Sequence, residues 1–189
     1  AVNGVCNFAT SLAAFCFMDP KIGTVDDLLD YCFGGERPAL YAEFAAWLRG
    51  SRRFKAFAAT NRGKLRAKLK SARDDQGLQD VRAEFQTAAL LLREERFTVQ
   101  YETYAAAKQR GPDFTVTYKT HTPFNVEVRR MRGAELPSQD AEASSGKLAA
   151  VLCDKVGQMP PSIVNLLWLV VEGELGEADI IRTTAALRQ

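Results

Sequence analysis

Two periods of hydrophobic and polar positions follow one another along this 189-residue chain, and the change falls near residue 97. Before it, apolar side chains recur every three to four residues, as in α-helices that bury one face. Helices are expected over residues 5–17, 24–33, 38–49 and 78–95. Thr24 is a residue type that commonly caps a helix N-terminus, and Gly34 and Gly35 are expected to end that helix.

After residue 97 the period falls to two, which indicates strands with two different faces. The alternating segments are residues 97–101, 114–118 and 124–129. Residues 163–171 form a continuous apolar run, which is typical of a strand covered on both faces. A loop and two further helices are expected over residues 133–146, 147–158 and 177–188. This order of helices and strands predicts an α/β fold.

The segment 51–73 holds nine basic residues and no acidic residue. Its apolar positions predict an amphipathic helix, or a pair of helices interrupted near Asn61-Arg62-Gly63. A solvated helix face explains such a charge run without any partner. In a nucleic-acid-binding protein the same face would contact phosphates. The candidate contacts are Arg52, Arg53, Lys55, Lys64, Arg66 and Lys68.

Composition narrows the class of protein only modestly. The net charge of +2 does not by itself indicate a polyanionic partner. The four cysteines form no C-x-x-C pair and there is a single histidine, His121, so we expect reduced thiols in a cytoplasmic protein and no zinc site. No apolar run is long enough for a bilayer, so no membrane partner is expected. The first residues lack a charged region and do not predict a signal peptide.

Acidic side chains fall at positions where two expected strands meet. Asp113 precedes one strand, and Glu127 and Arg129 share one face of the next. If these strands pair as a hairpin, Asp113 and Glu127 converge and offer oxygen ligands suited to Mg²⁺ or Mn²⁺. The alternatives are that Asp113 is only a turn residue after Gly-Pro, and that Glu127 and Arg129 lie on a solvated strand face.

The segments Gly111-Pro112-Asp113-Phe114 and Asn125-Val126-Glu127-Val128-Arg129 resemble the signature of PD-(D/E)XK nucleases, which include restriction-endonuclease-like and Holliday-junction-resolvase-like proteins. Asp113 and Glu127 match the two acidic positions. The resemblance covers about ninety residues, roughly from Glu84 to Val171. It implies a restriction-endonuclease-like core over residues 78–189, with a mixed central sheet flanked by helices, and an N-terminal helical extension over residues 1–77.

The resemblance also implies roles for residues outside the two strands. Glu84 matches a helix glutamate that often joins the metal site of the family. Three polar side chains on the expected helix before the last strand match accessory positions: Lys147, Lys155 and Gln158. The implied activity is metal-dependent hydrolysis of nucleic-acid phosphodiester bonds, most readily of DNA, and the resemblance also allows a homodimer.

Arg129 departs from the family pattern, because a lysine usually stands at this position. Arginine keeps the positive charge and binds phosphate through two donors, but it is planar, bulkier and always protonated. Two hypotheses therefore stay open: an active nuclease in which Arg129 contacts the phosphate, and a catalytically degenerate nuclease fold that binds nucleic acid or protein. A small-molecule enzyme unrelated to nucleases is a third reading, and no motif supports it.

Overall fold

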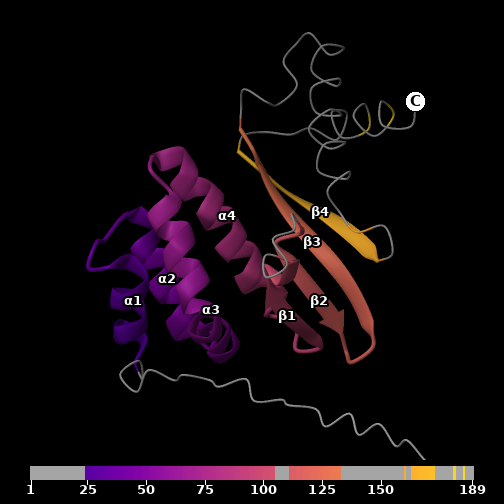
Figure 1. The fold of residues 1–189 in the computed structure, drawn as a ribbon, viewed down its shortest axis with the longest axis horizontal. Coiled ribbons are helices and arrows are strands. Elements are labelled where there is room, and N and C mark those ends of the chain that lie inside the picture. Colours follow the sequence, from indigo (N-terminus) through magenta and orange to yellow (C-terminus); the bar gives the residue numbers. More distant parts are fainter. Residues whose placement is uncertain are drawn as a thin grey trace, which may run out of the picture.

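The computed structural model describes residues 24–104, 111–132, 160, 163–172, 181 and 185. In it, helices lie beside one face of a four-stranded sheet (Figure 1). The helices are α1 (Val25–Phe33), α2 (Ala39–Gly50), α3 (Arg52–Ser71) and α4 (Asp75–Leu91). The strands are β1 (Phe97–Tyr101), β2 (Phe114–Tyr118), β3 (Thr122–Met131) and β4 (Val164–Val171). The predicted α/β class is therefore confirmed, with a mixed sheet flanked by helices.

The sheet has the strand order β1-β2-β3-β4. The first three strands are antiparallel neighbours, and β4 runs parallel to β3. Val164, Leu166 and Trp168 of β4 are 62%, 46% and 39% exposed. The expectation that this strand is covered on both faces is therefore wrong, because β4 lies at the edge of the sheet and presents one apolar row outward.

The helix bounds differ from the sequence pattern within α3 and at both ends of α4, which ends at Leu91 and not at the predicted residue 95. Residues of α3 form one continuous helix, so the predicted interruption at Asn61-Arg62-Gly63 is wrong. A mid-helix glycine costs only about 1 kcal/mol relative to alanine, and the buried Phe57 and Leu65 pack α3 on both sides of it. Helix α4 begins at Asp75, before the predicted residue 78, because Asp74 caps it by accepting a hydrogen bond from the Gly77 N–H.

One hydrophobic cluster extends from α1 to β3. Phe44 lies at its centre, with ring centroids 5.6 Å from Phe33, 5.5 Å from Phe54 and 5.4 Å from Phe85. The predicted boundary between a helical extension and a core, after residue 77, falls inside α4. The helices and strands β1 to β3 therefore share this cluster, while Met131 of β3 packs with Leu167, Leu169 and Val171 of β4 in a second cluster.

Arg130 of β3 links α4 to the sheet through ion pairs and hydrogen bonds. Its guanidinium is only 2% exposed and bonds to Asp80 of α4 and to Glu172, which follows β4, at 2.7 Å and 2.6 Å. It also donates to the backbone and side-chain oxygens of Gln76. Because Glu84 lies one helical turn after Asp80, this contact also fixes the position of Glu84 relative to β3.

Several predictions fall outside the described residues. These are the helices at 5–17 and 147–158, the loop at 133–146 and the accessory residues Lys147, Lys155 and Gln158. Ile181 and Ala185 are helical, in agreement with the helix expected over residues 177–188. Among the described helices, none has both the length and the apolar character needed to cross a membrane.

Candidate active site

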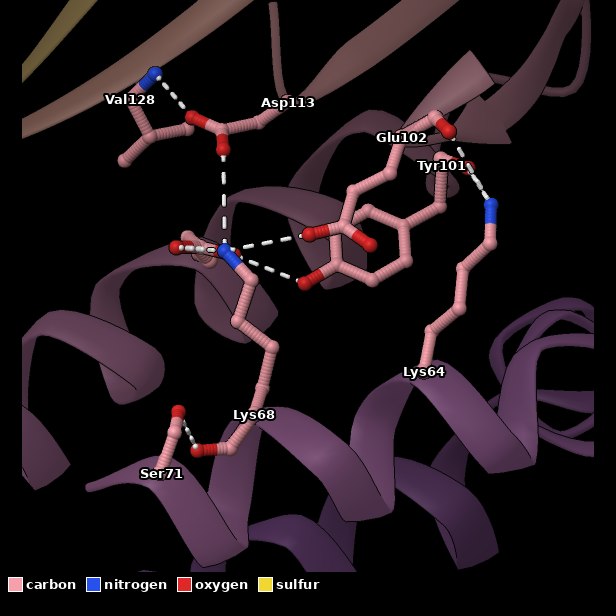
Figure 2. A network of polar contacts seen from close by, with 8 residues as sticks. Lys64, Lys68, Ser71, Tyr101, Glu102, Asp113 and Val128 are labelled. Carbon is pink, nitrogen blue, oxygen red and sulfur yellow. Dashed lines mark hydrogen bonds and ion pairs between the residues drawn. The ribbon is translucent and has the colours of Figure 1, made fainter. Parts of the chain in front are cut away.

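The ammonium group of Lys68 lies at the centre of an acidic cluster (Figure 2). Its Nζ atom is 2.7 Å and 2.8 Å from the two carboxylate oxygens of Glu84. It is also 3.3 Å from Oε1 of Glu102 and 4.0 Å from Oδ1 of Asp113. The Tyr101 hydroxyl donates to Oε2 of Glu84 at 2.8 Å. The group thus joins α3, α4, the end of β1 and the start of β2.

Strand pairing brings Glu102 and Asp113 together. Each lies just beyond the end of its paired strand, and the Glu102 N–H donates to the Asp113 carbonyl oxygen at 2.8 Å. Asp113 is also fixed by β3, because its Oδ2 atom accepts a hydrogen bond from the Val128 N–H at 2.8 Å. The position of Asp113 is therefore set by two neighbouring strands at once.

Glu102 has a backbone φ of 46°, in the left-handed region that non-glycine residues rarely adopt. Lys64 of α3 holds this end of β1, since its Nζ atom lies 2.6 Å from the Tyr101 carbonyl oxygen and 3.1 Å from that of Glu102. Conformations of this kind cost on the order of 1–3 kcal/mol and persist where surrounding contacts enforce them. Here the strain turns the Glu102 carboxylate toward Lys68.

Glu127 adds a further carboxylate from β3. It is 7% exposed, and the β2–β3 register places it beside Asp113, because Phe114 pairs with Val126. Arg129 follows two residues later on the same face of the strand and pairs in register with Leu169 of β4.

Burial and neighbouring charges raise the pKa of Asp113 to about 7. Burial is the largest cause, followed by the negative charges of Glu84 and Glu127, while the Val128 N–H and Lys68 act in the opposite direction. The charges of Glu84 and Glu127 thus act on Asp113, which is the group whose pKa they raise. Lys68 is the positive charge that offsets part of it.

Lys68 and Tyr101 are held in their protonated forms. Burial disfavours the charged form of Lys68, but Glu84, Asp113 and Glu102 outweigh it and raise the pKa of the ammonium group. Burial and the charge of Glu84 raise the pKa of Tyr101 well above its usual value. Lys68 therefore acts as a fixed cation and not as a base, and Tyr101 acts as a hydrogen-bond donor.

The predicted nucleic-acid contacts divide into two groups. Arg53 donates to the carbonyl oxygens of Leu92, Glu94 and Phe97, at the junction of α4 and β1. Lys64 and Lys68 are engaged with the end of β1 and with the acidic cluster. These three cations contact the junction of α4 and β1, the end of β1 and the acidic cluster. Arg66 instead lies over the Tyr31 ring of α1, with its guanidinium carbon 4.8 Å from the ring centre.

Sequence reasoning did not assign Glu102, Tyr101 or Lys68 to the site. One signal was available for Glu102, which directly follows the strand expected to pair with the strand after Asp113. No comparable signal marks Lys68, because its neighbours in α3 are equally basic. Its place in the site depends on the packing of α3 against β1.

The donor chemistry of the cluster suits a hard divalent cation, since Glu84, Asp113 and Glu127 offer carboxylate oxygens and an excess of negative charge. The side chains, as they lie, hold an ammonium group in that position. Within the described ranges, no set of three or more histidine, cysteine, aspartate or glutamate residues is arranged to hold a metal ion. A metal at Glu84 would therefore have to take the place of Lys68.

Comparisons of this chain with known protein families, with curated proteins and with solved structures give no match.

Proposed function

We propose that this protein hydrolyses nucleic-acid phosphodiester bonds, most readily in DNA, with a restriction-endonuclease-like core. The observation that carries the proposal is that Asp113 is buried near the negative charges of Glu84 and Glu127. Burial first, and then these two charges, raise the pKa of Asp113 to about 7. A fold seldom keeps like charges together in a buried place without a function for them. The mixed four-stranded sheet flanked by helices is compatible with such a core.

The proposed cofactor is Mg²⁺ or Mn²⁺, held by Asp113 and Glu127 with Glu84. Such an ion, when bound, polarises the phosphodiester and lowers the pKa of a bound water molecule. The mutual repulsion of the carboxylates favours a doubly charged cation over a singly charged one. Asp113 is held in position for this role by the Val128 N–H.

The protein supplies positive charge from a helix that precedes the core. The raised pKa of Lys68 keeps its ammonium group protonated. A metal bound at Glu84 would displace this group, which could then neutralise a phosphate that enters the cluster. In this proposal Lys68 shares the role that the sequence-based hypothesis gave to Arg129, with Lys147 and Lys155 as accessory candidates. Arg129 would contact the phosphate from β3 through its two-donor edge.

Cleavage assays with the full chain test the proposal. Double-stranded DNA, single-stranded DNA and RNA should each be offered with Mg²⁺, with Mn²⁺ and with EDTA. We expect chelator-sensitive cleavage that Asp113→Asn and Glu84→Gln reduce by at least 100-fold. Asp30→Asn removes an exposed carboxylate from α1 and should cleave as the wild type does. Absence of cleavage of every substrate with either ion would rule out the catalytic proposal.

A second function is favoured by the Lys68 contacts. Because the ammonium group already bonds to both oxygens of Glu84, the cluster is charge-balanced in part without any metal. The protein would then be a catalytically degenerate nuclease fold that binds nucleic acid or another protein. Calorimetric titration with Mn²⁺ separates the two functions, since only the catalytic one requires a bound ion.

Arg129→Lys gives a further discrimination, because it restores the usual residue of the family motif. Cleavage that appears only in this variant would identify the natural protein as degenerate. Cleavage by the wild type that Arg129→Lys changes little would show that another cation, such as Lys68, already serves. Failure of both forms to bind Mn²⁺ would show that the carboxylates do not form a metal site.

A further inference from the structure

Helix α3 carries its basic side chains on two opposite sides. Arg62 and Arg66 precede Lys64 and Lys68 by two residues each, and two residues turn a side chain by about 200° in a helix of 3.6 residues per turn. Lys64 and Lys68 point to β1 and the acidic cluster (Figure 2). Arg62 and Arg66 therefore point away from the candidate active site.

The cations on the far side form a row along the helix, which we call the outer stripe. Successive members lie three, four or seven residues apart, so they remain on one side of the helix. The members are Arg52, Lys55, Arg62, Arg66 and Lys70. No acidic residue occurs anywhere in residues 51–73, so α3 itself does not neutralise the stripe. From Arg52 to Lys70 the row is about 27 Å long at the rise of an α-helix.

Two arginines of the outer stripe lie over an aromatic ring. The guanidinium carbons of Arg66 and Arg62 lie 4.8 Å and 5.8 Å from the centre of the Tyr31 ring of α1. A cation–π contact of this kind restrains the arginine side chain. Such a pre-oriented group binds a phosphate with a smaller loss of side-chain entropy than a mobile one.

We propose that the outer stripe is a docking surface for the phosphate backbone of a nucleic acid, separate from the carboxylate cluster. A row of cations one or two helical turns apart complements a regular polyanion. A membrane surface is disfavoured, because the large apolar residues Phe54, Phe57 and Leu65 are at most 7% exposed and leave α3 without an apolar face for lipid.

Nucleic acid is the partner of both the outer stripe and the proposed cleavage site. The stripe, however, supplies no group that takes part in cleavage. A nucleic acid on the outer stripe lies on the opposite side of α3 from Asp113 and Glu84. The stripe would therefore anchor the nucleic acid away from the site of cleavage, and binding should persist when the carboxylates are altered. A protein that binds in this way but never cleaves would refute the proposed function alone.

Fluorescence anisotropy with a labelled 30-base-pair DNA in EDTA tests the surface without cleavage. With about four phosphates contacted, the logarithm of the affinity should fall with the logarithm of salt at a slope of about −3 to −4. Arg62→Gln/Arg66→Gln should weaken binding at least tenfold and reduce the magnitude of the slope by about 2. The matched control Arg93→Gln/Lys119→Gln removes two charges outside α3 and should bind within twofold of the wild type.

Four results would overturn the proposal. The first is no binding of this DNA or of an equally long RNA at 50 mM salt. The second is equal binding by the stripe variant and its control, with circular dichroism showing both folded. The third is loss of binding in Asp113→Asn but not in Arg62→Gln/Arg66→Gln, which would place the nucleic acid at the carboxylates. Vesicles that contain phosphatidylserine test a membrane surface as the alternative partner. Binding to these vesicles without binding to DNA would also refute the proposed nucleic-acid surface.

Discussion

The Nζ atom of Lys68 lies 2.7 Å and 2.8 Å from the two carboxylate oxygens of Glu84, although sixteen residues separate the two in the chain. This contact joins α3 to α4 beside the sheet. The two side chains are 26% and 14% exposed, so solvent screens the pair only in part. Removal of either charge alone leaves the other in a poorly solvated place.

We therefore expect Lys68→Met to lower the free energy of unfolding by about 2–3 kcal/mol, somewhat less than for a fully buried pair. Glu84→Gln/Lys68→Met should be more stable than the sum of the single losses predicts, with a coupling energy of about 1 kcal/mol or more. Urea unfolding of all four proteins measures this. Lys70→Met, which removes an exposed charge from the same helix, should change stability by less than about 0.5 kcal/mol. Additive losses would contradict the pairing.

Asp113 should make stability depend on pH. Its pKa is about 7 in the folded protein, above the ordinary value of 3.8, so between these values the folded state holds a proton that the unfolded state has lost. The contribution of Asp113 to the free energy of unfolding therefore falls as pH rises from about 4 to 7, and stays at its lowest value above that.

Asp113→Asn removes the unfavourable charge while keeping an oxygen that can accept the Val128 N–H. At pH 8 this variant should be more stable than the wild type by about 1 kcal/mol or more, which raises Tm by roughly 2–4 °C. Thermal unfolding followed by circular dichroism between pH 5 and pH 8 gives the comparison. A variant that is less stable than the wild type throughout this range would show that Asp113 is not destabilised by its neighbours.

Arg53 should be important for folding, not for partner binding. Its guanidinium donates hydrogen bonds to three backbone carbonyl oxygens where α4 ends and β1 begins. These belong to Leu92, Glu94 and Phe97. Because buried carbonyl groups without donors are unfavourable, Arg53→Met should lose about 2–4 kcal/mol of stability. Denaturant unfolding measures this, and Arg52→Met, one residue earlier on the exposed side, should be nearly neutral. Equal effects of the two substitutions would contradict the division of α3 into two basic sides.

Arg130→Met tests whether the sheet holds α4 in place. The partner carboxylates of Asp80 and Glu172 are 46% and 44% exposed and can return to water, so the expected loss is about 2–3 kcal/mol, below that of a closed buried pair. Faster amide hydrogen exchange in the first half of α4 should accompany it, since the Gln76 contacts are lost as well. Unchanged exchange there would show that hydrophobic packing alone positions the helix.

The chain by itself determined most of the local structure. The two hydrophobic periods predicted the described helices and strands, because an element must turn one face to the core at its own period. Thr24 caps α1 as expected, with a complete capping box. The spacing of Asp113 and Glu127 predicted that they lie side by side, since adjacent strands joined by a short turn pair with a defined register.

Only the tertiary structure decided which cation joins the carboxylates. Both sides of α3 are basic, so the sequence pattern does not reveal that Arg53, Lys64 and Lys68 face the protein while Arg62 and Arg66 face away. That choice follows from the packing of Phe57 on Tyr101 and Phe114, whose ring centroids lie 5.9 Å and 6.4 Å from its own. Contacts between distant segments set it, and no local period records them. The position of Glu102 in the cluster also depends on contacts between distant segments. Its backbone is left-handed, and hydrogen bonds to Asp113 and from Lys64 hold it there.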